Sequence, residues 1–258
     1  MLGKIITVLT IALAVFFLAL QTLRARARKR RQEINLKTRD KMVAIASASI
    51  EFVPVDAASV EGLNQGKLNE LTAILEQLGF ERLLDYRLRR GGETTLNGFE
   101  RVFAHPEEQC FASTMIAGSL DPQKSFSIAF NSYMQDGWRL GTSNIAARKA
   151  DYFLRLPRVL RMRYPDDPIE KLFARHLERR AEILRGLDIR VLPDISIEAY
   201  QQYVREASEQ RVDKVKTANP LGDLPLAEAQ ATARTQEWLG DYPAEAERLR
   251  AQKKLVTS

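Results

Sequence analysis

An uncharged stretch of 19 residues, Ile5 to Leu23, constrains the fold of this chain more than any other feature. Twelve of its residues are Leu, Ile, Val or Phe. As a helix it would extend about 28 Å, close to the roughly 30 Å hydrocarbon core of a bilayer. Its summed transfer free energy, roughly −4 to −7 kcal/mol before the polar residues are counted, favours insertion. The stretch therefore predicts a single transmembrane helix over residues 5–23.

The cations that flank this stretch predict its orientation. Six of the next eight residues are basic, whereas Lys4 is the one charged side chain upstream. Because cytoplasmic flanks carry the excess of Lys and Arg, we expect residues 1–4 outside and the bulk of the chain in the cytoplasm. This predicts a signal-anchored, single-pass protein of the plasma or inner membrane. The basic residues are also candidates for contact with anionic lipid headgroups. They are Arg24, Arg26, Arg28, Lys29, Arg30 and Arg31.

Two other interpretations of the N-terminus are weaker. Ala25-Arg26-Ala27 resembles the small-residue site of a cleaved signal peptide, but it lies inside the cationic cluster, and the apolar stretch exceeds the usual length of about 7–15 residues. A nucleic-acid-binding arm would not need an adjacent spanning helix. The net charge of +6 is also local, since residues 24–41 carry nine cations and two anions, so that the rest of the chain sums to −1. We therefore expect no nucleic-acid partner.

The order of sequence patterns after residue 62 predicts an α+β fold. Leucines at helical spacing, followed by Gly79, predict a helix over about 66–78. From Phe80 to Ile145 the apolar period changes to two, with turn residues at short intervals, which predicts an antiparallel meander of about five strands. The third strand is apolar on both faces and is expected at the centre. In the last hairpin we expect a three-residue loop that pairs Met134 with Trp138.

The C-terminal part is predicted to be helical. Asp167 as N-cap, followed by Pro168, predicts a helix that runs to about Arg185 and is closed by Gly186. Further helices are expected over about 196–217, 225–239 and 243–254. The predicted division is residues 1–4 outside, a transmembrane helix 5–23, a basic juxtamembrane linker 24–62, a sheet domain 63–165, a helical extension 166–219 packing on that domain, and C-terminal helices 220–258.

Few residues suggest chemistry. His105 lies in a turn with Pro106, which favours a solvated loop over a metal or general-base site. His176 borders the apolar stripe of its helix and is expected at the boundary of the core. Cys110, the one cysteine, cannot form an internal disulfide and is expected to be buried and inert. With two histidines and one cysteine, we predict neither a metal site nor a cofactor.

One strand and one basic segment remain as candidates for binding. The polar residues of "RLGTSN" lack the glycine pattern of a phosphate loop and suggest a ligand-facing sheet surface. These candidates are Arg139, Thr142 and Asn144. The stretch Arg155–Pro165 alternates cations with apolar residues, which fits a strand with one wet face, a linker or a partner-facing edge.

Without a catalytic constellation, the sequence favours a function in binding over a function in catalysis. We expect a membrane-anchored adaptor, scaffold or assembly factor with a protein partner. A second hypothesis is a pocket for a small or lipidic ligand, lined by Phe126, Ile128, Phe130 and Trp138. A third is an enzyme that uses carboxylates such as Asp85, Glu107 or Asp136.

Overall fold

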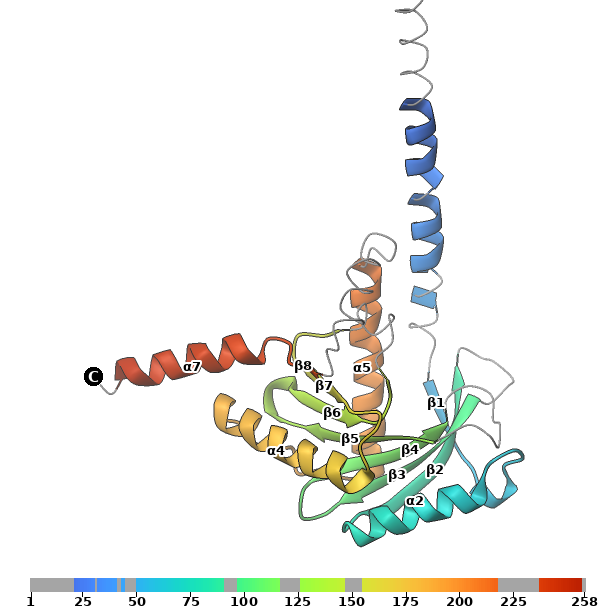
Figure 1. Cartoon of the computed structure of the whole chain (residues 1–258), viewed down its shortest axis with the longest axis vertical. Coiled ribbons are helices and arrows are strands. Elements are labelled where there is room, and N and C mark those ends of the chain that lie inside the picture. Colours follow the sequence, from blue (N-terminus) through green and yellow to red (C-terminus); the bar gives the residue numbers. More distant parts are fainter. Residues whose placement is uncertain are drawn as a thin grey trace, which may run out of the picture.

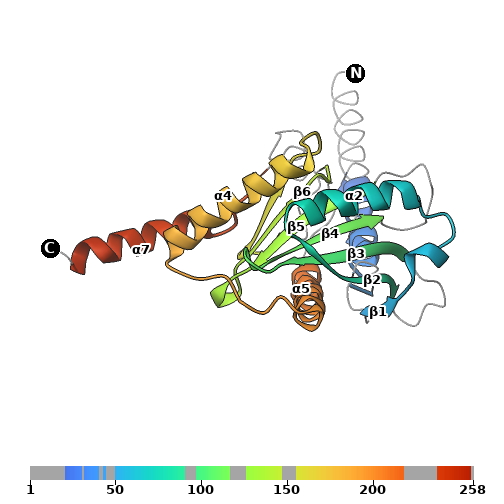
Figure 2. The same cartoon turned by 90° about the horizontal axis from the view of Figure 1, so that it is seen from below.

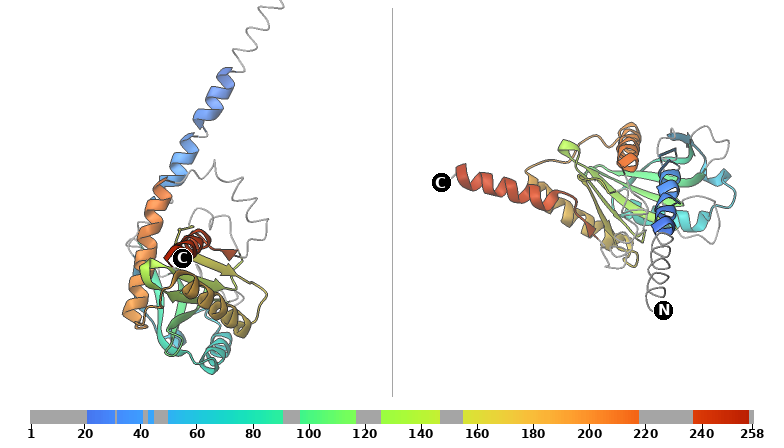
Figure 3. Two further views of the ribbon diagram at one scale, coloured as in Figure 1. Left: turned by 90° about the vertical axis from the view of Figure 1, so that its left-hand side faces the viewer. Right: turned by 90° about the horizontal axis from the view of Figure 1, so that it is seen from above.

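The computed structural model of the chain describes residues 21–30, 32–40, 43–44, 50–90, 97–116, 126–146, 155–217 and 237–256. They form an α+β fold in which helices cover both faces of one twisted sheet (Figures 1 and 2). The helical residues 21–30 and 32–40 extend away from the sheet (Figure 3).

The sheet has eight strands in sequence order, so the prediction of about five was wrong. Its strands are β1 (Ile50–Pro54), β2 (Glu81–Arg90), β3 (Asn97–His105), β4 (Cys110–Ile116), β5 (Ser127–Tyr133), β6 (Arg139–Ser143), β7 (Val159–Arg163) and β8 (Glu237–Trp238). Neighbouring strands are antiparallel except β6 and β7, which are parallel. The strands β2 to β6 cover the expected meander. The other three lie outside it in the sequence and pair through long connections, which alternation within one segment does not reveal.

One face of the sheet carries α2 (Gln65–Gln77) and α4 (Ile169–Leu187), and α7 (Tyr242–Val256) packs beside α4 (Figure 2). Asn64 caps α2 by accepting a hydrogen bond from the Lys67 amide. The main apolar core lies between these helices and the middle strands. It includes Leu68, Leu75, Phe103, Phe130 and Leu172.

The opposite face of the sheet is covered by α5 (Ile197–Thr217). A second, smaller core there includes Phe52, Val102, Phe111 and Tyr200. Because both faces are covered, β4 is buried at six of its seven residues, which confirms its expected central position. The predicted helices over about 66–78 and 196–217 are confirmed as α2 and α5.

The hairpin between β5 and β6 has the expected three-residue loop. The Met134 amide donates to the Trp138 carbonyl at 2.9 Å, and Tyr133 pairs with Arg139. Within the loop, Asp136 and Gly137 have φ angles of 58° and 75°, the left-handed region that glycine and aspartate tolerate best. The register of the two strands follows from this loop.

Both ends of α4 differ from the prediction. Pro168 occupies the N-cap position without a side-chain hydrogen bond, and the helix begins at Ile169. The Asp167 carboxylate instead accepts from Lys171 at 2.9 Å and from Arg175 at 2.8 Å. At the other end the helix continues through Gly186 to Leu187.

The predicted helix over about 225–239 lies mostly outside the described residues. At its described end, Glu237 and Trp238 form β8, so the prediction was wrong there. The last helix, predicted over about 243–254, is confirmed as α7.

The predicted single-pass anchor requires a correction. Among the residues that the structure describes, no helix has both the length and the apolar character needed to cross a bilayer. This finding contradicts the transmembrane helix, and with it the predicted membrane location. Residues 5–20 of the predicted span lie outside the described residues. Residues 21–23 are helical, as are the exposed residues Arg24, Arg26, Arg28, Lys29 and Arg30, whereas Arg31 lies outside the described residues.

Candidate functional site

His176 lies fully buried in the core, not at its boundary as predicted. Its Nε2 is 2.8 Å from the Ser132 hydroxyl oxygen, and its Nδ1 is 2.9 Å from the Thr142 hydroxyl oxygen. Burial, with a smaller contribution from Arg180, lowers the pKa of His176 to about 3. A neutral ring has one donor and one acceptor nitrogen, and two hydroxyls can match both. The three residues therefore form a closed hydrogen-bonded unit between α4 and the sheet.

His105 and Cys110 flank the turn between β3 and β4. Cys110 begins its strand as expected, whereas His105 is buried at the end of β3 and does not lie in a solvated loop. The His105 ring packs edge-on against Phe80, with 5.0 Å between ring centroids, and its Nδ1 accepts from the Glu108 amide at 3.2 Å. Cys110 is fully buried, and burial raises the pKa of its thiol to about 12. The thiolate needed for nucleophilic attack is thus disfavoured. No group of three metal-ligating side chains occurs among the described residues.

The three predicted ligand-facing residues of β6 do not converge. Arg139 faces α5, where it donates to the Tyr203 carbonyl at 3.1 Å and to Glu206 at 2.9 Å. Thr142 faces α4 and bonds to His176, because side chains alternate along a strand. Asn144, just beyond the strand, accepts from the Ile128 amide at 2.7 Å. Each side chain has a separate structural partner.

The residues proposed to line an apolar pocket belong to the main core. All four are buried there, together with residues of α2 and α4. They are Phe126, Ile128, Phe130 and Trp138.

The three carboxylates that we considered for catalysis also lie apart. Glu107 and Asp136 are exposed in two different turns, whereas Asp85 is buried on β2.

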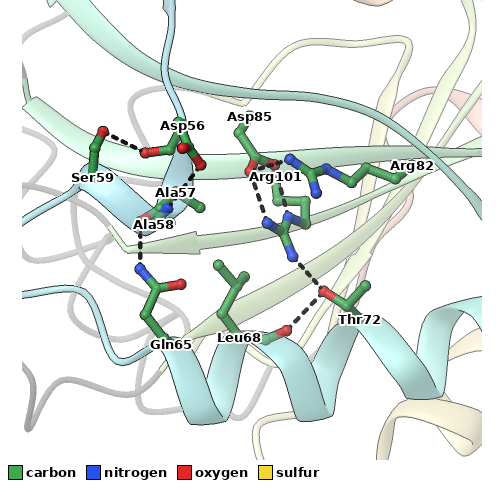
Figure 4. A network of polar contacts seen from close by, with 10 residues as sticks. All are labelled: Asp56, Ala57, Ala58, Ser59, Gln65, Leu68, Thr72, Arg82, Asp85 and Arg101. Atoms are coloured by element: carbon green, nitrogen blue, oxygen red, sulfur yellow. Dashed lines mark hydrogen bonds and ion pairs between the residues drawn. The ribbon is translucent and has the colours of Figure 1, made fainter.

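Asp85 belongs to a buried polar network between α2 and the sheet (Figure 4). Arg101 on β3 donates to both Asp85 carboxylate oxygens, each at 2.7 Å, and Arg82 donates to one of them at 2.7 Å. The third guanidinium nitrogen of Arg101 donates to Thr72 on α2 at 2.8 Å. Thr72 in turn donates to the Leu68 carbonyl. The polar side-chain atoms of Asp85, Arg101 and Thr72 all have protein partners, which indicates a structural network that links α2 to the sheet.

A second network, which we did not predict, fastens α5. Glu100 on β3 accepts from the Tyr86 hydroxyl at 2.5 Å and from the Tyr200 hydroxyl at 2.7 Å. Burial, and then the charge of Glu100, raises the pKa of both tyrosines. Both hydroxyls therefore stay protonated as donors. Beside them, Tyr133 and Tyr203 stack with ring centroids 3.9 Å apart.

The described residues also form a crevice outside the sheet, between α4 and α7. It has a volume of about 430 Å³ and is open to solvent. We call it the α4–α7 crevice. Its lining residues are Arg179, Glu182, Arg185 and Gly186 of α4, and Tyr242 and Arg250 of α7. Three arginines and one glutamate give this lining a formal charge of +2.

The charges in the α4–α7 crevice are unevenly matched. Arg179 donates to Glu182 at 2.7 Å and to Glu237 of β8 at 2.8 Å, so the one carboxylate of the lining is already paired. Arg185 and Arg250 are exposed, and neither has a hydrogen bond or ion pair with another residue that the structure describes. Arg185 and Arg250 thus have no direct partner among the described residues, although Glu182 and Glu237 together carry one more negative charge than the Arg179 that they share.

Close packing at Gly186 holds α7 in place. The Tyr242 hydroxyl donates to the Glu182 carbonyl at 3.2 Å. A Cβ atom on Gly186 would lie 2.7 Å from the Tyr242 hydroxyl oxygen, so a larger residue there would require the Tyr242 ring to shift. This contact sets where Arg250 lies relative to α4.

Sequence reasoning missed this crevice. Arg185 and Arg250 lie on the solvent-exposed sides of two separate helices, where single arginines are common. Their approach depends on a long-range contact between α4 and α7.

No protein family model, curated protein or solved structure matches this chain.

Proposed function

We propose that this protein acts by binding, as an adaptor or assembly factor, and that the α4–α7 crevice receives an acidic segment of its partner. The observation that carries the proposal is the pair of guanidinium groups without a direct partner among the described residues, Arg185 and Arg250, on the walls of one crevice. Planar guanidinium groups match carboxylates and other oxyanions with two parallel hydrogen bonds.

The size and exposure of the crevice support the same function. About 430 Å³ lies within the range of roughly 300–1,000 Å³ that is typical of ligand sites. Both arginines are exposed before binding, so a partner's carboxylates replace water on them without first breaking an ion pair within the described residues. Glu182 is hydrogen-bonded to Arg179 and contacts neither of them directly.

A defined acidic peptide tests this function. A fluorescein-labelled peptide of alternating glutamate and glycine is titrated with the full chain at 0.15 M ionic strength, and fluorescence anisotropy gives its Kd. We expect the double variant Arg185→Glu and Arg250→Glu to weaken binding at least about tenfold. Each exposed charge pair contributes up to about 1 kcal/mol, and reversal adds repulsion.

The matched control reverses two cations elsewhere. Lys214 and Lys216 are exposed near the end of α5, and their change to glutamate alters the net charge equally. We expect this control to change the Kd by less than about threefold. Equal weakening in both double variants, or equal affinity for a serine–glycine peptide, would contradict the proposed function.

A further inference from the structure

We propose that the α4–α7 crevice selects a phosphate group over a carboxylate, so that the segment it receives carries a phosphorylated side chain. This inference rests on the proposed function and specifies its ligand. It starts from the number of unmatched charges, since the crevice offers two guanidinium groups, Arg185 and Arg250, where one would match a carboxylate.

The charge of the ligand's anionic group distinguishes a phosphate from a carboxylate. A carboxylate carries one negative charge and two oxygens, which a single guanidinium fork satisfies. A phosphate monoester carries about −1.5 to −2 at pH 7 and three strong acceptor oxygens. A phosphate monoester therefore matches two guanidinium groups, one from each wall of the crevice.

The two guanidinium groups belong to separate helices. Arg185 comes from the last turns of α4, and Arg250 comes from α7. The packing of Tyr242 over Gly186 keeps the two helices together, and the Tyr242 hydroxyl is already used on the Glu182 carbonyl. The groups free to contact the ligand are thus the two guanidinium groups, one on each side.

Arg179 holds the two carboxylates beside the crevice. It pairs with both Glu182 and Glu237, and Glu237 also accepts from the Tyr164 hydroxyl at 2.6 Å. Neither acid forms a hydrogen bond or ion pair with Arg185 or Arg250 within the described residues. A strongly charged anion gains most from this arrangement, because it meets both free cations at once.

The test compares two probes that differ only in the side-chain anion. N-acetyl-phosphoserine methylamide and N-acetyl-glutamate methylamide are titrated into the full chain at equal ionic strength, and NMR follows the arginine Nε–H signals. We expect phosphoserine to bind at least about fivefold tighter and to shift the signals of Arg185 and Arg250. The single variants Arg185→Gln and Arg250→Gln each weaken phosphoserine binding at least threefold, and they bring its affinity close to that of the glutamate probe.

The controls separate this inference from the proposed function. Both arginines are exposed, so their variants are expected to fold, which circular dichroism checks. The double variant Lys214→Gln and Lys216→Gln should leave phosphoserine binding unchanged within twofold. Equal affinity for the two probes overturns the phosphate preference and leaves acidic-peptide binding standing. Failure of the acidic peptide and of both probes overturns the two proposals together. Phosphoserine binding that survives both arginine changes also overturns the inference.

Discussion

His176 is a buried polar side chain that is held by partners from distant segments. Its two hydroxyl partners, Ser132 and Thr142, lie on β5 and β6. The helical pattern around His176 predicts which face of α4 it occupies, but the depth of its burial depends on where the sheet lies. The burial of Cys110 was easier to predict, because its own strand is apolar on both faces.

The lowered pKa of His176 predicts an acid-sensitive stability. The folded state holds the ring neutral with a pKa of about 3, whereas an unfolded histidine has a pKa near 6.5. The unfolded state therefore binds more protons below pH 6.5. The contribution of the neutral His176 ring to the free energy of unfolding is fully present above pH 6.5 and is lost progressively as the pH falls from 6.5 towards 3. At pH 5 this group lowers the free energy of unfolding by about 2 kcal/mol relative to pH 8.

Urea unfolding at pH 8 and pH 5 measures this effect. The variant His176→Gln keeps a donor and an acceptor but cannot titrate in this range, so its loss of stability between the two pH values should be smaller by about 2 kcal/mol. Equal losses in the two proteins would show that His176 does not titrate as the burial implies.

At the scale of elements, features with a local cause were predicted well. Leucine spacing and a glycine at its end predicted α2, and the loop residues 135–137 predicted the hairpin register. The start of α4 failed because Asp167 has two uses, as a cap or as an ion-pair partner, and Lys171 and Arg175 compete for it. The two-residue strand β8 failed because it depends on β7, far away in the sequence.

One buried ion pair joins β2 and β3, and its arginine also donates to α2. The side chains of Arg101 and Asp85 are 5% and 1% exposed. Replacing Arg101 with leucine leaves the Asp85 charge buried with Arg82 as its remaining ion-pair partner, and also removes the donor to Thr72. We expect a loss of about 3–5 kcal/mol in the free energy of unfolding, measured by chemical denaturation.

An exposed pair provides the comparison. Arg248 pairs with Glu245 on the surface of α7, and Arg248→Leu should lower the free energy of unfolding far less than Arg101→Leu, because solvent screens an exposed pair. The double variant Asp85→Leu with Arg101→Leu should recover much of the loss, since no buried charge remains unpaired. Similar costs for Arg101→Leu and Arg248→Leu would contradict a special role for the buried pair.

At the scale of the whole molecule, the α4–α7 crevice is a product of tertiary packing. Its walls come from helices that are separated by α5 and β8 in the sequence. Arg185 and Arg250 are ordinary surface residues of their own helices, and only the packing of α7 on α4 brings them into one crevice. The apolar stretch of residues 5–23 predicted a membrane location, but the described residues contain no spanning helix, so the account of function rests on the folded body instead.

Hydrogen exchange of the full chain, with and without the acidic peptide, tests most directly where a partner binds. Mass spectrometry follows the exchange of each segment. The account predicts slower exchange over the last turns of α4 and over Tyr242–Arg250 of α7 when the peptide is present, with α2 and α5 unchanged. Protection confined to α5, to α2 or to the helical residues 21–40, or no protection anywhere, would contradict binding at the α4–α7 crevice.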